Sequence, residues 1–342
     1  MSPADPARDG QTLAGNGSGE ASGSAMTAPS AVTTISLSPA IDHHIGIAGF
    51  TAGTLNRVHR EEMYAGGKAV NVAACLADLG VAVTVTGLLG SDNADVFERL
   101  FASKGIRDAC VRFPGRTRSN IKIVSGDMPQ VTEINFPGSF PGNEYLARVE
   151  RAVETLLADC SCLVLAGSLP AGVATTYYAD LIGRLQAAGK RVALDSSGGA
   201  LRHGIIARPW LIKPNLAELE ELVDEPLPDA VAAAAAARRL VATGIERVVV
   251  SLGERGALFV TADRCLQAIP PPTIVHSTVG AGDALLAGHI VGCLYGWPLA
   301  RSARLAIAAA SARLATIGSG LPPRREVEAL MATIELRELD PD

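Results

Sequence analysis

The 342-residue sequence has no apolar run that reaches the ~20 residues needed for a membrane-spanning helix. Its longest alanine-rich run ends at Arg238 and Arg239. The first thirty residues also lack the basic segment followed by an apolar segment that marks a secretory signal peptide. We therefore expect a cytoplasmic protein that has no membrane partner.

Basic clusters and metal-binding spacings are missing as well. The 30 Lys and Arg residues are outnumbered by 35 Asp and Glu residues, and the net charge of −5 is spread along the chain. A nucleic-acid-binding surface needs a basic patch, so we expect a small ligand instead. The cysteines show neither a CxxC pair nor a Cys/His zinc spacing, which predicts reduced core thiols. They are Cys75, Cys110, Cys160, Cys162, Cys265 and Cys293.

What the sequence contains is a regular alternation of apolar strands and helices after residue 30. Residues 1–30 are rich in Gly, Ser, Ala and Pro, which predicts a disordered tail. The alternation is typical of an α/β domain whose mostly parallel sheet is covered by helices on both faces. We expect this domain to span residues 31–325, followed by a C-terminal helix and tail at 326–342.

The individual elements follow from apolar periodicity and from Gly and Pro boundaries. Strands are predicted at 32–37, 81–88, 162–166, 191–194, 210–212 and 247–251, and a hairpin at 253–260 and 265–268. Helices are predicted at 69–79, 95–103, 144–157, 175–188, 216–223 and 230–242, and from residue 284 onward.

Two groups of short alternating strands interrupt this rhythm, at about 45–64 and 111–137. Gly and Pro turns separate them, so we predict a small antiparallel β sheet inserted in two pieces. In an open parallel sheet, ligands bind at the carboxyl ends of the strands. The inserted sheet therefore fits a lid that covers the carboxyl ends of the strands.

The segment Gly280-Ala281-Gly282-Asp283 precedes an apolar helix. Small residues at a helix N-terminus expose N–H groups to an anion such as phosphate. Asp283 then has two interpretations. It is either an ordinary acid in the first turn, or a base that accepts a hydroxyl proton while the N–H groups neutralise a transferring phosphoryl group.

Lys213, Asn215 and Glu218 follow another predicted strand. The spacing of Asn215 and Glu218 fits two roles, a capping box at the start of a helix or a pair of oxygen ligands for hydrated Mg²⁺. Ser251, Gly253, Glu254 and Gly256 also follow a strand, where they form either a plain turn or a surface on which a nucleotide packs against backbone. Ser168 also has two interpretations, because its hydroxyl group could contact the substrate or could begin the next helix.

Gly66, Gly67, Lys68 and Asn71 place N–H groups, a cation and an amide at a helix N-terminus, without the remaining spacing of a P-loop. Arg116, Arg118 and Lys122 lie on a predicted lid strand. They form either a solvated face or a site for a phosphate that the substrate already carries.

Taken together, these segments resemble the PfkB family of ribokinase-like sugar kinases over about residues 33–321. Within the family the sequence is similar to the branch of 1-phosphofructokinase and tagatose-6-phosphate kinase. The matching segments are Ser38 to Asp42, Asn56 to Val58, Gly67 to Ala73, Thr117 to Lys122 and Thr132 to Gly138. Ala69, Phe136 and His43 depart from residues common in that branch.

The resemblance implies a ribokinase-like three-layer sandwich with a β lid that often pairs two subunits. It implies ATP-dependent phosphorylation of a ketohexose phosphate, with fructose 1-phosphate converted to fructose 1,6-bisphosphate as the first expectation. Alternatives are a tagatose-6-phosphate kinase, a 6-phosphofructokinase, a ribokinase- or nucleoside-kinase-like enzyme, and a non-catalytic sugar-phosphate sensor.

The resemblance also assigns roles. Asp283 would be the base, Gly280, Ala281 and Gly282 the anion hole, and Asn215 and Glu218 the water-mediated contacts to Mg²⁺. The sugar phosphate would contact Asp42, Gly66, Gly67, Lys68, Asn71, Arg118, Arg57, Lys122 and Ser168. ATP would contact Lys213, Asn215, Ser251, Gly253, Glu254, Gly256 and Ser277.

Overall fold

The computed structural model of the protein describes residues 31–125, 130–273, 275–316 and 318–339. The predicted disordered tail at 1–30 lies outside the described residues. All six cysteines are unbonded, and four of them are buried, as predicted for core thiols. Within the described ranges no helix has the length and apolar character to cross a membrane.

A large sheet forms the middle layer, in the order β14-β13-β12-β11-β10-β9-β8-β1-β4-β5. Every neighbouring pair from β11 to β5 is parallel, as predicted from the apolar strands. These strands are β1 (Ala31–Ser36), β4 (Val83–Gly90), β5 (Arg107–Phe113), β8 (Cys160–Ala166), β9 (Arg191–Asp195), β10 (Leu211–Ile212) and β11 (Arg247–Ser251). The antiparallel edge consists of β12 (Ala257–Val260), β13 (Cys265–Ile269) and β14 (Glu335–Glu338).

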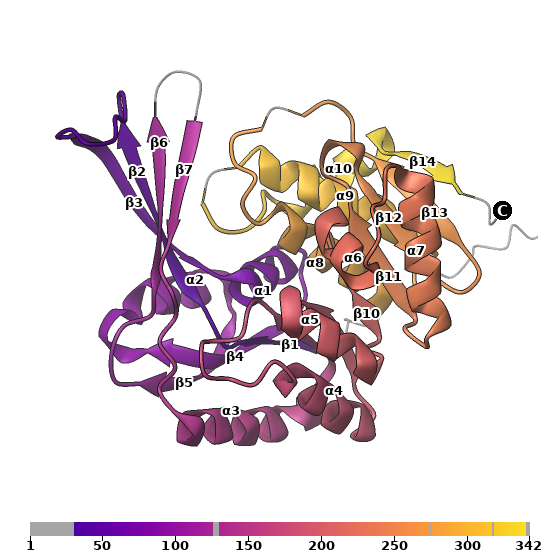
Figure 1. The fold of residues 1–342 in the computed structure, drawn as a ribbon, viewed down its shortest axis with the longest axis horizontal. Helices are drawn as coiled ribbons and strands as arrows, with labels where there is room; N and C mark the ends of the chain where they lie inside the picture. The colour runs from indigo at the N-terminus through magenta and orange to yellow at the C-terminus, as the bar shows by residue number, and fades with distance from the viewer. Residues whose placement is uncertain (1–30, 126–129, 274, 317, 340–342) are drawn as a thin grey trace, which may run out of the picture.

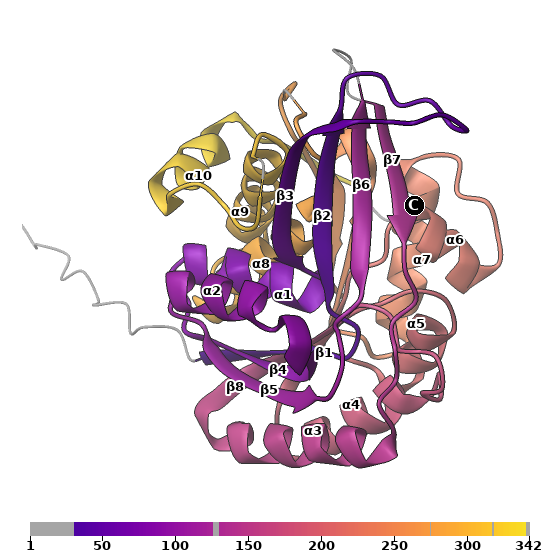
Figure 2. The same ribbon diagram turned by 90° about the vertical axis from the view of Figure 1, so that its left-hand side faces the viewer.

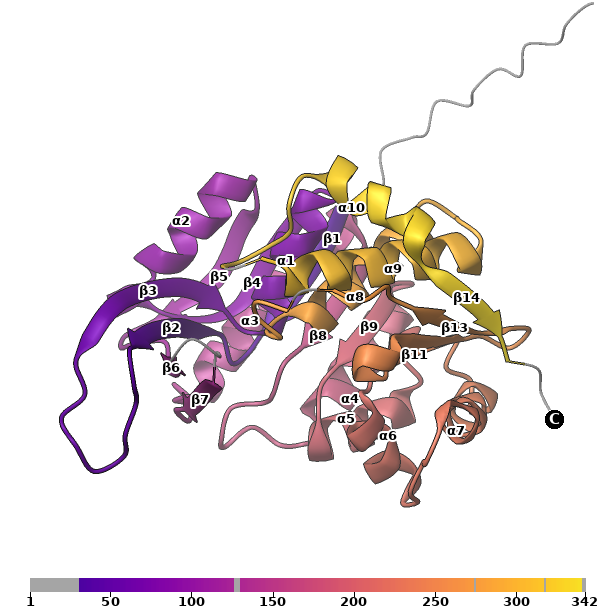
Figure 3. The ribbon, with the colours of Figure 1, turned by 90° about the horizontal axis from the view of Figure 1, so that it is seen from above.

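Helices cover both faces of this sheet and make the outer two layers (Figure 3). One face carries α1 (Lys68–Asp78), α2 (Asp95–Lys104), α8 (Ala281–Leu294), α9 (Leu299–Leu314) and α10 (Arg324–Leu330). The other carries α3 (Asn143–Leu156), α4 (Tyr177–Ala187), α5 (Gly198–Gly204), α6 (Leu216–Val223) and α7 (Ala230–Ala242). Each face therefore has its own apolar core.

A second sheet, the lid, stands out from the body of the molecule (Figures 1 and 2). Its order is β3-β2-β6-β7. The strands are β2 (Ala40–Ile47), β3 (Val58–Gly66), β6 (Ser119–Ser125) and β7 (Gln130–Asn135). Two antiparallel hairpins, β2–β3 and β6–β7, are joined through the parallel pair β2–β6. The two pieces of the predicted lid thus meet at its centre.

Three sequence predictions need correction. Residues 111–113 do not belong to the lid, because they end β5, which pairs with β4 at the edge of the large sheet. An edge strand is solvated on one side, so its alternating pattern imitates that of a lid strand. The first lid piece begins at Ala40 rather than Ile45, which places Asp42 inside β2. The C-terminal segment contains a short polar strand, β14, which has no apolar periodicity to predict it.

Helix α8 fixes the position of the glycine-rich segment, because the helix begins at Ala281 rather than at the predicted residue 284, and Gly280 is its N-cap. Apart from Asp283 and His289 its side chains are apolar on all sides, and Ala284 through Val291 are buried. A helix that is buried on all sides cannot tilt without losing core contacts. Its N-terminus is therefore held at the junction between the body and the lid.

Candidate active site

The first turn of α8 carries a buried carboxylate beside backbone N–H groups, of which that of Ala281 makes a long hydrogen bond of 3.5 Å to the carbonyl of Thr278. Gly280 is the N-cap residue with a φ of 80°, a left-handed conformation that favours glycine. Asp283 is only 5% exposed, and its Oδ2 accepts a hydrogen bond of 2.8 Å from Nδ2 of Asn71 in α1. Two residues predicted to share a site thus meet although 212 positions separate them. We call residues 280–282 the anion loop.

The surroundings of Asp283 make its carboxyl group more basic. Burial raises the pKa of Asp283, and the nearby Lys68, Lys213 and Asn71 offset the rise only in part. A carboxylate with a raised pKa binds a proton more readily than an exposed one. The position and basicity of Asp283 therefore suit a proton acceptor.

Two lysines share one buried carboxylate next to the anion loop. Asp195, at the end of β9, is fully buried. Its Oδ1 accepts a hydrogen bond of 2.9 Å from Nζ of Lys68, and Nζ of Lys213 lies 3.3 Å from its Oδ2. Burial alone would raise the pKa of Asp195, but the two ammonium groups outweigh it and hold the pKa below its ordinary value.

This cluster of Lys68, Asp195 and Lys213 brings cations to the loop. A Cβ added to Gly282 would lie 3.3 Å from Nζ of Lys213. The sequence predicts Lys68 as a contact of the sugar phosphate and Lys213 as a contact of ATP. The predicted strand at 191–194 ends one residue before Asp195, so Asp195 is not among the predicted site residues. The available signal was an acid directly after an apolar strand of a parallel sheet, the position where ligands bind.

Asp42 is held at the base of the lid by the neighbouring strand. It is 7% exposed, its Oδ1 accepts from Nδ2 of Asn120 at 3.2 Å, and its Oδ2 lies 3.1 Å from Nζ of Lys122. Gly66 lies against the same carboxylate, because a Cβ there would come within 2.7 Å of Asp42 Oδ2. Lys122, predicted as a partner of a substrate phosphate, is thus paired with Asp42.

The other predicted substrate residues differ in exposure. Arg118 is half-buried and donates from Nη1 to Oδ1 of Asn120 at 2.9 Å and to the carbonyl of Phe136 at 3.2 Å. Burial lowers the pKa of its guanidinium. Arg57 is exposed in the loop between β2 and β3, away from these groups, and Ser168 is exposed just after β8.

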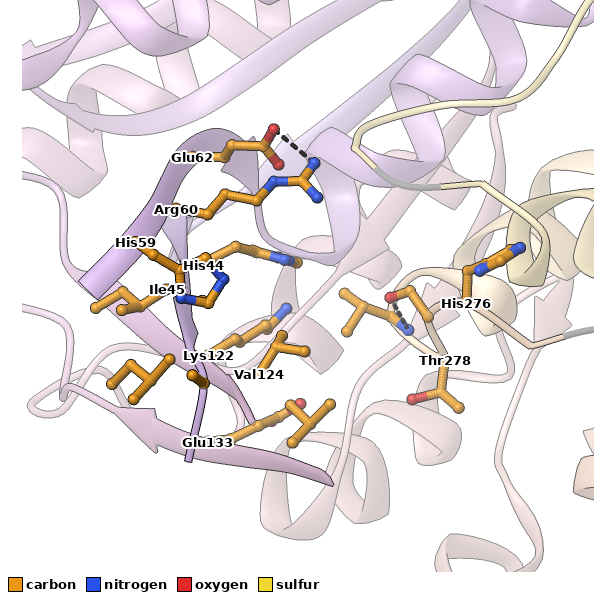
Figure 4. A pocket seen from close by; sticks show the side chains of 16 residues that line it. His44, Ile45, His59, Arg60, Glu62, Lys122, Val124, Glu133, His276 and Thr278 are labelled. Atoms are coloured by element: carbon orange, nitrogen blue, oxygen red, sulfur yellow. Dashed lines mark hydrogen bonds and ion pairs between the residues drawn. The ribbon is translucent and has the colours of Figure 1, made fainter. Parts of the chain in front are cut away.

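A cavity of about 430 Å³ separates the lid from the segment that leads into the anion loop (Figure 4). His44, Arg60 and Lys122 point from the lid across this space toward Thr278. Burial and the charge of Lys122 lower the pKa of His44. Ser277, predicted on the nucleotide side, lies on the wall that faces the lid.

Sequence patterns did not predict most of the lid residues that line the cavity. His44, Glu62 and Glu133 line it together with Arg60. Their signal was the alternation of β2, β3 and β7, since polar residues two apart share one face of a strand. Glu62 also accepts a hydrogen bond from the hydroxyl of Tyr64.

The predicted nucleotide side is assembled at the ends of β10 and β11. Asn215 and Ser251 are adjacent through an isolated parallel bridge. Asn215 and Glu218 form the capping box, with both side chain to backbone bonds at 2.8 Å. Gly253 has open space around it and Glu254 is exposed.

Gly256 has a structural reason to be glycine, because a Cβ there would come within 1.9 Å of the carbonyl oxygen of Ala268. The capping box uses one oxygen of Asn215 and one of Glu218, so the two residues have a helix-stabilising role whatever they bind. In the part of the chain that the structure describes, no three His, Cys, Asp or Glu side chains are grouped to hold a metal.

The sequence is similar to those of known carbohydrate kinases. The profile of the pfkB family of carbohydrate kinases matches residues 36–325. A 1-phosphofructokinase of Rhodobacter capsulatus is 45% identical over 311 residues, which cover 91% of this chain and 98% of that protein. A 1-phosphofructokinase of Xanthomonas campestris pv. campestris is 44% identical over 286 residues, 82% of this chain and 90% of that protein.

Solved structures give the same fold. Phosphofructokinase-2 from Escherichia coli, in complex with substrates and products, superposes with a TM-score of 0.83 at 30% identity and covers 88% of this chain and 98% of its own. A possible 1-phosphofructokinase from Thermotoga maritima has a TM-score of 0.82 at 25% identity, with 91% and 100% covered. The predicted ribokinase-like fold is confirmed.

Proposed function

The chain belongs to the pfkB family of carbohydrate kinases, and from that membership we propose that it is a 1-phosphofructokinase. Such an enzyme transfers the γ-phosphoryl group of ATP to fructose 1-phosphate and releases fructose 1,6-bisphosphate and ADP. The observation that carries the proposal is the extent of identity to relatives of that name, which includes nearly their whole length. A tagatose-6-phosphate kinase, a 6-phosphofructokinase or a ribokinase- or nucleoside-kinase-like enzyme would use the same machinery on another substrate, whereas a non-catalytic sensor would bind a sugar phosphate without turnover.

The geometry supports a phosphotransferase mechanism in which positioning and charge neutralisation dominate. Asp283 accepts the proton of the acceptor hydroxyl, since it is buried and its pKa is raised. The N–H groups of Ala281 and Gly282 face the charge that develops on the phosphoryl oxygens. Asn71 keeps the Asp283 carboxylate oriented through its hydrogen bond.

The substrate sugar phosphate is assigned to the space between the lid base and α1. Asp42, held by Asn120 and Lys122, binds sugar hydroxyl groups. Arg118 supplies a half-buried cation for the phosphate that the substrate already carries. Gly66 keeps room for this arrangement by its lack of a side chain.

ATP is assigned to the ends of β10 and β11, near Asn215, Ser251 and Gly253. Mg²⁺ typically keeps several waters and is bound through substrate phosphates and one or two carboxylates. Glu218 fits this requirement, because the capping box uses its Oε2 and none of the described residues donates to its Oε1. When bound, Mg²⁺ would neutralise phosphate charge, with Asn215 and Glu218 contacting it through water.

A homodimer through the lid is the assembly we propose. Met63, Ile134 and Phe136 are about half exposed on the lid. Met63 and Ile134 belong to one cross-strand row, through His43 and Ile121, which predicts a shared apolar face. Light scattering at micromolar concentration should give twice the chain mass of 35.3 kDa, and a monomeric mass would contradict the proposal.

The function is tested by ADP release with Mg-ATP against fructose 1-phosphate, fructose 6-phosphate, tagatose 6-phosphate, ribose and adenosine. We expect the highest kcat/KM for fructose 1-phosphate. Asp283→Asn should lower kcat by about two orders of magnitude or more, the range of a lost general base. Preference for fructose 6-phosphate would identify a 6-phosphofructokinase, and turnover of ribose or adenosine alone would contradict a sugar-phosphate site.

A further inference from the structure

Arg313 is a buried cation directly behind the anion loop. It lies in the last turn of α9 and is 6% exposed. Its Nε lies 3.1 Å from the position that a Cβ on Gly280 would occupy, and Nδ2 of Asn71 lies 3.8 Å from the same point. The guanidinium is therefore packed against the N-cap of α8, next to the amide that orients Asp283.

The Arg313 guanidinium donates to backbone carbonyl groups, and the carboxylates of Asp283 and Asp42 attract its charge without a direct ion pair. Nη1 donates to the carbonyl of Thr316 at 2.8 Å and Nη2 donates to the carbonyl of Gly318. No ion pair joins Arg313 to a described carboxylate, and none of the described residues accepts from its Nε–H. Burial lowers the pKa of Arg313 in spite of these two carboxylates, so an anion that binds the loop would offset part of the cost of burying the cation.

Arg313 also connects the anion loop to the base of the lid. Gly318, which it holds, is packed against Tyr64 of β3, since a Cβ on Gly318 would lie 3.2 Å from Cε1 of Tyr64. The next residue, Ser319, donates from its hydroxyl to the carbonyl of Ala65 at 2.9 Å. One side chain thus contacts both the loop and the segment on which β3 rests.

We propose that Arg313 is a positioning residue for phosphoryl transfer, which holds a fixed positive charge behind the anion loop and favours the phosphoryl group there. This inference deepens the proposed function and rests on it. In the reaction the bond from the γ-phosphorus to the ADP oxygen breaks, the bond to the acceptor oxygen forms, and the hydroxyl proton passes to Asp283. Arg313 acts on this step through Gly280 and does not touch the reacting atoms.

Variants of Arg313 distinguish the effect of its charge on kcat from the effect of its shape. Arg313→Gln and Arg313→Met remove the charge, and Arg313→Lys retains it. We expect kcat to fall about tenfold to a hundredfold in both neutral variants, below the loss for a donor that touches the oxyanion. KM for either substrate should change less than about threefold, and Arg313→Lys should recover most of kcat, because the effect is electrostatic.

The pH profile gives a readout that a merely structural residue would not move. Asp283 faces Lys68, Lys213 and Asp195 in addition to Arg313. Removing one cation disfavours the carboxylate form, so the acid limb of kcat/KM should shift to higher pH in the neutral variants. In Arg313→Lys the acid limb of kcat/KM should lie at the same pH as in the wild-type enzyme.

Arg304 provides the matched control on the same helix. Its Nη1 donates to the carbonyls of Met331 and Ile334, away from the anion loop. Arg304→Met should lower thermal stability and leave kcat unchanged. Wild-type kcat in Arg313→Gln, or equal losses in Arg313→Gln and Arg313→Lys, would overturn the role of the charge. Failure of the wild-type protein to phosphorylate fructose 1-phosphate would overturn the proposed function instead.

Discussion

Substitution of Asp195 by Asn tests whether the buried cluster of Lys68, Asp195 and Lys213 stabilises the fold through charge balance. Asn has nearly the same shape but no charge, so it leaves two ammonium groups beside a neutral amide. The side chains of Asp195 and Lys213 are 0% and 3% exposed, and that of Lys68 is 38% exposed. The pairs Asp195–Lys213 and Asp195–Lys68 therefore contribute unequally to the free energy of unfolding.

The magnitude follows from this exposure. Breaking a buried ion pair costs about 3–5 kcal/mol, which applies to Lys213. The Lys68 side is screened by solvent and adds at most about 1 kcal/mol. We expect a loss of about 4 kcal/mol in the free energy of unfolding. At ~2.1 cal/mol/K of unfolding entropy per residue, over about 300 ordered residues, this lowers Tm by about 6 °C.

The assay is thermal and urea unfolding of wild type, Asp195→Asn and two reference variants. Asp95→Asn breaks an exposed pair with Arg99, whose side chains are 61% and 69% exposed, and should cost below about 1 kcal/mol. The double variant Asp195→Asn/Lys213→Met removes the buried cation as well and should regain stability relative to Asp195→Asn alone. Equal losses for Asp195→Asn and Asp95→Asn would refute the argument.

Two further predictions concern the site. Because the pKa of Asp283 is raised and its carboxylate form must accept the proton, kcat/KM of the wild-type enzyme should fall on acidification at a pH above ~3.9, the ordinary pKa of Asp. An acid limb at or below that pH would contradict the assignment. Gly66→Ala places a Cβ 2.7 Å from Asp42 Oδ2, so the carboxylate must shift, and kcat/KM for the sugar phosphate should fall about tenfold to a hundredfold with KM for ATP unchanged. Wild-type kinetics for the sugar phosphate in Gly66→Ala would remove Asp42 from the substrate site.

Local sequence patterns predict the order and type of most elements. Predicted helices at 216–223 and 230–242 and the predicted strand at 247–251 match α6, α7 and β11, because apolar periodicity and caps are local. The sequence also predicts the anion loop, because small residues before an apolar helix expose N–H groups, and its binding of an anion stays a prediction. Resemblance to sugar kinases predicts that Asp283 is the base and that Asn71 holds the sugar, and the hydrogen bond between the two is visible only in the structure.

Which charges face one another depends on how distant elements pack. Asp195 neutralises lysines that stand 127 residues before it and 18 residues after it, and Arg313 reaches Gly280 from another helix. Lys122 pairs with Asp42 because β6 lies beside β2, a register that neither strand encodes alone. Periodicity reports which face of an element is buried, but not which element covers it. The electrostatics of this site therefore depend on long-range packing, and the sequence pattern could not reveal them.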